Sequence, residues 1–130
     1  SMEYSEIKIL EGINNIDVKQ YGLNCFIEKE PEKEDIKAAR EGLQEVEEVL
    51  NSGEYDLVIL DEANIAVYFD LFSIDELVEV IEERDKGIEV VVTGRNAKKE
   101  IIDKADLVTD MQEIKHYYEK GVKARDGIGR

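Results

Sequence analysis

The feature that most constrains the fold is the segment Leu57–Glu62, in which four apolar residues are followed by an aspartate and a glutamate. A short apolar run of this kind is typical of a strand buried on both faces, as in the parallel sheet of an α/β protein. The acidic pair then falls at the carboxyl end of the strand, where open α/β sheets bind their ligands. The segment therefore predicts an α/β fold with a candidate site at Asp61 and Glu62.

In P-loop nucleotide-binding proteins, an acidic residue at this place holds Mg²⁺ or its water beside the phosphates. Its usual partner is the loop G-x-x-x-x-G-K-[ST], whose backbone N–H groups surround the phosphates. None of the nine glycines of this sequence is followed by lysine. The sequence therefore carries half of a nucleotide site. On these residues alone, an Asp-Glu pair more often caps a turn or faces water.

Helical and strand patterns alternate along the chain. Apolar spacing and a Ser73/Glu76 capping box predict four helices: Tyr4–Leu10, Glu32–Asn51, one opening at Ser73 and ending at Lys86-Gly87, and one from Ala97 to Ala105. Runs of strand-forming residues predict four strands: Ile16–Tyr21, Leu57–Leu60, Ile88–Val92 and Leu107–Val108. Repeated strand–helix–strand units imply a parallel sheet with right-handed crossovers. At 130 residues and without a linker, the chain is expected to form one domain, residues 1–130.

Composition excludes several classes of partner. With 32 acidic and 17 basic residues, the net charge is −15, which argues against nucleic acid or an anionic membrane surface as a partner. A locally basic pocket for ATP stays compatible with this charge. The single cysteine, Cys25, rules out an internal disulfide framework and fits a reducing, cytoplasmic setting. No apolar run approaches the roughly 18 residues of a membrane span, and no signal peptide is visible.

Several segments agree in order and spacing with one known family. They are Tyr55–Glu62 with Asn64–Ala66, then Val91–Ala97, Ala105–Thr109, Lys115-His116, Gly121–Ala124 and Gly127-Ile128. Together they resemble the P-loop type corrinoid adenosyltransferases, which act on cob(I)alamin or cob(I)yrinic acid a,c-diamide. The resemblance runs from about residue 3 to residue 128. It implies a P-loop (RecA-like) nucleotide-binding fold that is incomplete at the amino terminus, because the family's Walker A strand, its helix and a second strand are absent here. We therefore expect a carboxyl-terminal fragment of such an enzyme.

The resemblance implies transfer of the 5′-deoxyadenosyl group of ATP to the Co(I) ion of a reduced corrinoid, in cobalamin biosynthesis or salvage. Glu62, with Asp61, matches the family's Mg²⁺-linked carboxylate. Arg95 matches the arginine of the family's T-G-R turn, expected to neutralise phosphate charge with its planar fork of donors. Thr93 and Lys123 are likewise expected to bind ATP.

The loop at Asn24, Cys25 and Phe26 falls where the family presents aromatic residues to the corrinoid, although this sequence offers Phe26 alone where an aromatic pair is usual. Taken by themselves, Cys25 fits a small semi-buried side chain, Arg95 a surface residue, and His116, the only histidine, a structural role. A multi-histidine metal site is impossible.

Two functions from different classes remain open. The chain is either part of an adenosyltransferase, inactive by itself, or a naturally short, non-catalytic relative that binds a corrinoid or a partner protein. The resemblance also implies a homodimer, and the missing strand would leave sheet edges that recruit a second chain, giving a dimer or a higher oligomer.

Overall fold

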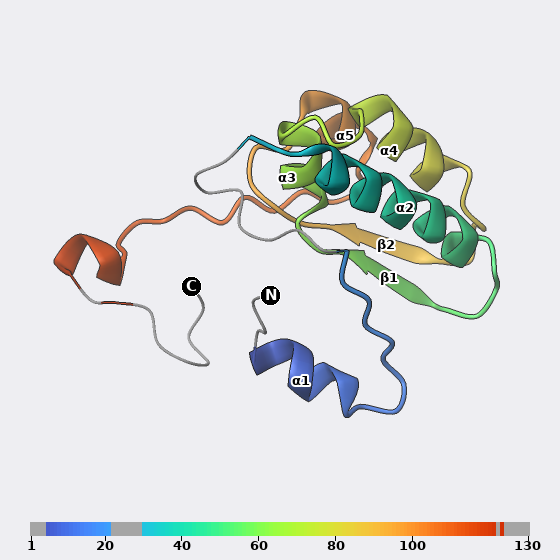
Figure 1. The fold of residues 1–130 in the computed structure, drawn as a ribbon, viewed down its shortest axis with the longest axis horizontal. Coiled ribbons are helices and arrows are strands. Elements are labelled where there is room, and N and C mark those ends of the chain that lie inside the picture. The colour runs from blue at the N-terminus through green and yellow to red at the C-terminus, as the bar shows by residue number, and fades with distance from the viewer. Residues whose placement is uncertain (1–4, 22–29, 122, 124–130) are drawn as a thin grey trace. The chain divides into compact units, whose positions relative to one another are not determined.

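The computed structural model describes residues 5–21, 30–121 and 123. Its elements in chain order are α1 (Ser5–Glu11), α2 (Lys33–Leu50), β1 (Leu57–Leu60), α3 (Ala63–Tyr68), α4 (Ile74–Glu82), β2 (Glu89–Val92), α5 (Lys99–Lys104) and the short 3-10 helix η1 (Tyr117–Lys120) (Figure 1). The chain divides into two compact units, one of Ser1–Gln20 with Leu107–Arg130 and one of Tyr21–Asp106. Whether these make up one domain stays a prediction.

The larger unit contains a two-stranded parallel sheet. β1 pairs with β2 in a register that sets Leu57 opposite Glu89 and Leu60 opposite Val92. The connection between the strands contains α3 and α4, as a parallel pair requires. The predicted α/β class and the two strands Leu57–Leu60 and Ile88–Val92 are therefore confirmed. This small α/β arrangement is compatible with a P-loop fold.

Among the described residues of the larger unit, one face of the strands is covered and the other is exposed, which corrects the prediction that Leu57–Leu60 is buried on both faces. The helices of this unit lie on one side of the sheet (Figure 1), and Leu60 belongs to the core with partly buried Val58 and Val90. Side chains alternate between the two faces of a strand. Leu57 and Ile59 are therefore 52% and 57% exposed, although an apolar run by itself predicts burial.

Two predicted strands are wrong. Neither Ile16–Tyr21 nor Leu107–Val108 lies in a strand, and Leu107 is 84% exposed. A strand persists only where a neighbouring strand accepts and donates its backbone hydrogen bonds. Among the described residues, β1 and β2 pair with each other and the sheet has no third strand. The sequence pattern of a segment does not show whether a neighbouring strand will pair with it.

Two helices follow their sequence signals closely, whereas the helix predicted from Ser73 to Lys86-Gly87 ends at Glu82 and helix α3 was not predicted. The helix predicted over Glu32–Asn51 spans Lys33–Leu50, and the one predicted near Tyr4–Leu10 spans Ser5–Glu11. The Ser73/Glu76 capping box is present, because the Ser73 N–H donates to Glu76 at 2.8 Å and the Glu76 N–H donates to the Ser73 hydroxyl at 3.1 Å. The last predicted helix is shorter than expected and covers Lys99–Lys104.

Glu76 also ties α4 to α2. The Arg40 guanidinium donates to both of its carboxylate oxygens, with the shortest contacts at 3.0 Å. The backbone N–H of Ser73, and to a lesser extent the charge of Arg40, hold the pKa of Glu76 below its usual value. Since the pair is about half exposed, the ion pair contributes at most about 1 kcal/mol. The cap and the ion pair share one side chain.

Gly42 in the middle of α2 has a packing reason. A Cβ at this position would lie 2.8 Å from Cγ of Tyr21, so the phenol ring rests on the helix backbone. The Tyr21 hydroxyl donates to the Glu45 carboxylate one turn farther along. Burial, reinforced by this hydrogen bond, raises the pKa of the Tyr21 phenol well above its usual value. Tyr21 is thus fixed on α2 immediately before the loop at Asn24–Phe26, which lies outside the described residues.

A double-mutant cycle tests this contact. In the wild-type background, Gly42→Ala should lower the free energy of unfolding by about 1–3 kcal/mol, because the methyl group overlaps the Tyr21 ring. In a Tyr21→Ala background, the same change should instead raise the free energy of unfolding by about 1 kcal/mol, the ordinary gain of alanine over glycine in a helix. Urea unfolding followed by circular dichroism measures both. Equal effects in the two backgrounds would show that the ring does not rest on Gly42.

Candidate functional site

The candidate site lies where β1 and β2 end. Leu60 and Val92 are opposite each other in the parallel register, and the Thr93 N–H donates to the Leu60 carbonyl at 3.2 Å. The turn beginning at Asp61 and the turn beginning at Thr93 therefore leave the same edge of the sheet as neighbours. This is the edge at which open α/β sheets bind ligands.

The Thr93 hydroxyl joins the two turns. It donates to Oδ1 of Asp61 at 2.8 Å and accepts from the backbone N–H of Glu62 at 3.0 Å. A hydroxyl has one hydrogen to donate, and in Thr93 that hydrogen is used by Asp61. The structure thus gives the Thr93 hydroxyl a role in holding the acidic pair in place, and the ATP binding expected of Thr93 stays a prediction.

Glu62 adopts a left-handed backbone conformation, with φ of 61° and ψ of 18°. For a residue with a Cβ atom this conformation is unfavourable by about 1 kcal/mol or more, and such residues cluster at functional sites. The Glu62 carbonyl then accepts the first hydrogen bonds of α3, from Ile65 and Ala66. Among the described residues its side chain has no hydrogen bond or ion pair, and it is exposed. Its carboxylate is available to a ligand.

Of the predicted residues, the structure brings Asp61, Glu62 and Thr93 together. Arg95 follows Gly94 in the same turn, is exposed, and has no ion pair within the described part of the chain. Lys123 is exposed and belongs to the smaller unit, so its part in ATP binding stays a prediction.

The structure does not place the other predicted positions against this set. Asn24, Cys25 and Phe26 lie outside the described residues. His116 is exposed, with Nδ1 4.0 Å from Glu113, and belongs to the smaller unit.

Sequence reasoning missed Asn64. It is 7% exposed and is the one buried polar side chain of the described residues. Its amide Nδ2 donates to the carbonyl of Gly94 at 3.2 Å, and its backbone N–H donates to the carbonyl of Thr93 at 3.2 Å. The available signal was a polar residue inside the otherwise apolar stretch that follows the acidic pair. Nothing local distinguished it from an exposed asparagine.

The acidic pair suits a magnesium ion better than a transition metal. Carboxylate oxygens are hard donors, and Mg²⁺ commonly takes one or two of them together with water and substrate phosphates. In the described part of the chain, no three or more His, Cys, Asp and Glu side chains converge to form a metal site. Asp61 and Glu62 therefore fit an ion whose other ligands come from water and a phosphate substrate.

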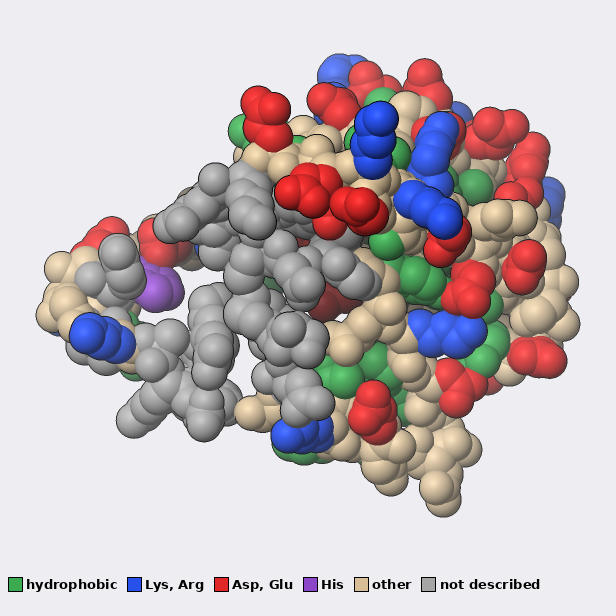
Figure 2. Space-filling model, in the orientation of Figure 1, with side chains coloured by type: hydrophobic (Ala, Val, Ile, Leu, Met, Phe, Trp, Pro, Cys, Tyr) green, Lys and Arg blue, Asp and Glu red, His purple; other side chains and the backbone are tan. Residues whose placement is uncertain are grey.

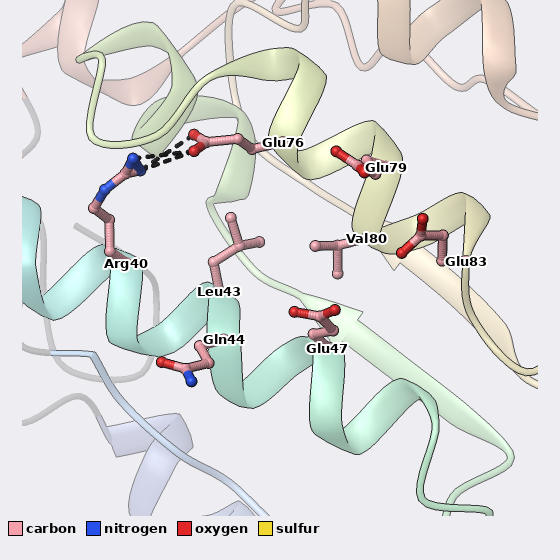
Figure 3. A pocket seen from close by; sticks show the side chains of 8 residues that line it. All are labelled: Arg40, Leu43, Gln44, Glu47, Glu76, Glu79, Val80 and Glu83. Carbon is pink, nitrogen blue, oxygen red and sulfur yellow. Dashed lines mark hydrogen bonds and ion pairs between the residues drawn. The ribbon is translucent and has the colours of Figure 1, made fainter.

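A groove lies between α2 and α4, and none of its lining residues belongs to the turns of Asp61 and Thr93 (Figure 3). This groove of about 340 Å³ is lined by Arg40, Leu43, Gln44, Glu47, Glu76, Glu79, Val80 and Glu83. Its one arginine is already paired with Glu76, which leaves the groove acidic, and Figure 2 shows Asp and Glu side chains over the same helical face. It is therefore unsuited to the phosphate groups of a nucleotide.

A parallel sheet with an acidic pair at its carboxyl edge places the protein in the class of α/β proteins that bind ligands at strand ends. A family model described as "ATP:corrinoid adenosyltransferase BtuR/CobO/CobP" matches residues 1–129. The chain belongs to this corrinoid adenosyltransferase family, as the sequence resemblance had predicted.

Individual relatives agree. The chain is 39% identical over 95 residues to a corrinoid adenosyltransferase of Sinorhizobium sp., covering 72% of this chain and 44% of that protein. It is 35% identical over 94 residues to the one of Escherichia coli K12, covering 72% and 48%. For the one of Pseudomonas aeruginosa the values are 35% over 101 residues, covering 78% and 50%. The chain thus spans about half the length of the curated relatives it matches.

In the part of the chain that the structure describes, none of the helices combines the length and the apolar character that crossing a membrane requires.

The bridging role of the Thr93 hydroxyl is testable by two matched substitutions. Thr93→Val keeps the shape but removes the hydroxyl, and should lower the free energy of unfolding by about 1 kcal/mol or more because two hydrogen bonds are lost. Thr93→Ser keeps the hydroxyl and should retain most of the stability. Urea unfolding of the three proteins measures the difference. If valine were as stable as serine at this position, the hydroxyl would not be holding the two turns.

Proposed function

We propose that this chain belongs to an enzyme that transfers the 5′-deoxyadenosyl group of ATP to the Co(I) ion of a reduced corrinoid, in cobalamin biosynthesis or salvage. The observation that carries the proposal is the strand-end site of a family member, in which an unpaired Glu62 carboxylate stands beside the turn of Thr93 and Arg95. The relatives that are named corrinoid adenosyltransferases support the same reaction.

This reaction needs no nucleophile from the protein. The cobalt ion of the substrate supplies the electron pair that forms the bond to C5′. The bond between C5′ and its oxygen breaks, and triphosphate leaves with the electron pair of that broken bond. The protein must bind the triphosphate, orient the ribose and exclude water. Carboxylates and an arginine at a strand end suit these tasks, whereas an activated serine, cysteine or histidine is not needed.

Each site residue then has a defined role. Glu62, with Asp61, would hold Mg²⁺, which when bound neutralises charge on the triphosphate leaving group. The Arg95 guanidinium would bind phosphate oxygens with its fork of donors. Thr93 keeps the Asp61 carboxylate and the Glu62 backbone in place, and Lys123 would contribute positive charge to the nucleotide.

The corrinoid would be received by the loop at Asn24, Cys25 and Phe26. By the family resemblance, an aromatic residue there displaces the lower axial ligand of the cobalt and makes the ion easier to reduce.

A second candidate is a non-catalytic module that binds a corrinoid or a partner protein. Such a module would not need a G-x-x-x-x-G-K-[ST] sequence, whereas the enzyme would. Reading the coding DNA upstream of Met2 separates the two. An in-frame sequence of that type supports the enzyme, and a stop codon directly upstream supports the module.

The isolated chain should bind Mg-ATP too weakly to adenosylate corrinoids. Most of the phosphate donors in such sites are backbone N–H groups of the glycine-rich loop, and Glu62 and Arg95 do not replace them. Isothermal titration calorimetry of the 130-residue chain with Mg-ATP should give no micromolar binding. A micromolar dissociation constant would mean that the site is complete without that loop.

In the complete protein that contains this chain, Glu62→Gln should lower turnover by about 10²–10³, since it removes a negative charge from the Mg²⁺ site while keeping the shape. His116→Ala should change turnover much less. The measurement is the rate of adenosylcorrinoid formation from chemically reduced corrinoid and Mg-ATP. Equal losses from the two substitutions would give His116 a role in the reaction and argue against this assignment of Glu62.

We also propose that the chain associates into a dimer or a larger assembly. The two-stranded sheet has an apolar face exposed at Leu57, Ile59 and Val91, and sheets this small are rarely stable alone. Light scattering during size exclusion should give a mass above the 14.9 kDa monomer at tens of micromolar. Ile59→Lys, which puts a charge on that face, should shift the distribution toward monomer. A clean wild-type monomer would contradict the proposal.

A further inference from the structure

We propose that Asn64 is a positioning residue, which holds the turn of Thr93–Arg95 against the turn of Asp61 and Glu62. Its effect would be to fix the place of Arg95 relative to the Glu62 carboxylate. The inference rests on the proposed function, which assigns these two charged groups to the triphosphate and its metal ion. Nothing in the family description or in the names of the relatives assigns a role to Asn64.

The first support is the pattern of donors. Asn64 is the second residue of α3, where backbone N–H groups have no partner within the helix. Its N–H donates to the carbonyl of Thr93, and its side-chain Nδ2 donates to the carbonyl of Gly94, each at 3.2 Å. One residue thus binds two successive carbonyl groups of the facing turn. The first turn of helix α3 is therefore hydrogen-bonded to the turn that carries Arg95.

The second support is burial. Asn64 is 7% exposed and lies on a helix whose other buried residues, Ala66 and Val67, are apolar. A buried amide without a partner is costly, whereas an apolar side chain would need none. Of the described side chains, none leaves a buried nitrogen or oxygen atom without a hydrogen bond. The hydrogen bond to Gly94 therefore accounts for a polar residue at this place.

The third support is the close approach at Gly94. Its backbone has φ of 121°, a conformation that residues with a Cβ atom rarely adopt. A Cβ there would lie 3.1 Å from Cβ of Asn64 and 3.3 Å from Cα of Glu62. The turn therefore passes closely over both residues. The direction in which the chain continues to Arg95 is set by this contact together with the Nδ2 hydrogen bond.

The consequence for the reaction concerns placement of charge. A displacement of about 1 Å in a group that binds the leaving group can lower a rate by about 10². Asn64 touches neither substrate in this account, so it acts through the turn that carries Arg95. Its removal should affect turnover even in protein that remains folded.

The test uses Asn64→Asp and Asn64→Ala with Asn51→Asp as the matched control. Aspartate has the shape of asparagine but no Nδ2 donor, and alanine removes the donor without adding charge. Asn51 makes the same kind of bond, from Nδ2 to the carbonyl of Glu47 at 2.8 Å, at the exposed end of α2. Asn51→Asp therefore changes the charge and removes an amide donor equally, but away from the site.

The first measurement needs no substrate. Amide hydrogen exchange of the 130-residue chain, followed by NMR, reports on the N–H groups of Glu62 and Asn64, which bond to Thr93. Both Asn64 variants should exchange these hydrogens at least 10-fold faster relative to the β2 amide of Val91, and the Asn51 variant should not. Unchanged relative exchange in both Asn64 variants would overturn the inference.

The second measurement is adenosyl transfer by the complete protein, below the melting temperature of every variant. Both Asn64 variants should lower kcat at least 10-fold with a smaller change in KM for ATP, whereas Asn51→Asp should stay within 2-fold. Wild-type kcat in both Asn64 variants would reduce Asn64 to a structural residue and overturn the inference. If exchange changes as expected but the wild-type protein transfers no adenosyl group, the proposed function is wrong and the positioning of the turn is upheld.

Discussion

The register in which β1 pairs with β2 determines what can meet at the candidate site. With Leu60 opposite Val92, the next residues are Asp61 and Thr93, and the Thr93 hydroxyl can reach both the Asp61 carboxylate and the Glu62 backbone. A slip of one residue would turn Thr93 to the other face of the sheet. The hydrogen bonds of Asn64 to the facing turn depend on the same register. Backbone pairing in the sheet thus sets the side-chain geometry beyond it.

The helices stabilise this register from one side of the sheet. α2 and α4 pack over β1 and β2 through Leu43, Val46 and Leu77, and the capped start of α4 is joined to α2 by Glu76 and Arg40. None of the acidic residues of these two helices is buried, so the helices add to the net charge of −15 without bringing a carboxylate into the apolar core. In the larger unit, the opposite face of the sheet exposes the apolar residues Leu57, Ile59 and Val91.

The family match and the geometry of the strand-end site are two separate kinds of evidence about this protein. The family match covers residues 1–129, yet the chain spans about half the length of its curated relatives. The strand-end site contains the residues that would hold a metal ion and the phosphate charge.

By itself, the sequence determined the elements whose signals are local: helices α2 and α4 with their periodic apolar faces and caps, and the two strand-forming runs Leu57–Leu60 and Ile88–Val92. It also placed Asp61 and Glu62 at a strand end, since that follows from the order of residues alone. Only the tertiary structure decided that Ile16–Tyr21 and Leu107–Val108 are not strands, that β1 is covered on one face, and that Thr93 and Asn64 bind the opposite turn. The physical reason is that strand pairing and these hydrogen bonds join residues about thirty positions apart, where no short sequence pattern records the partner.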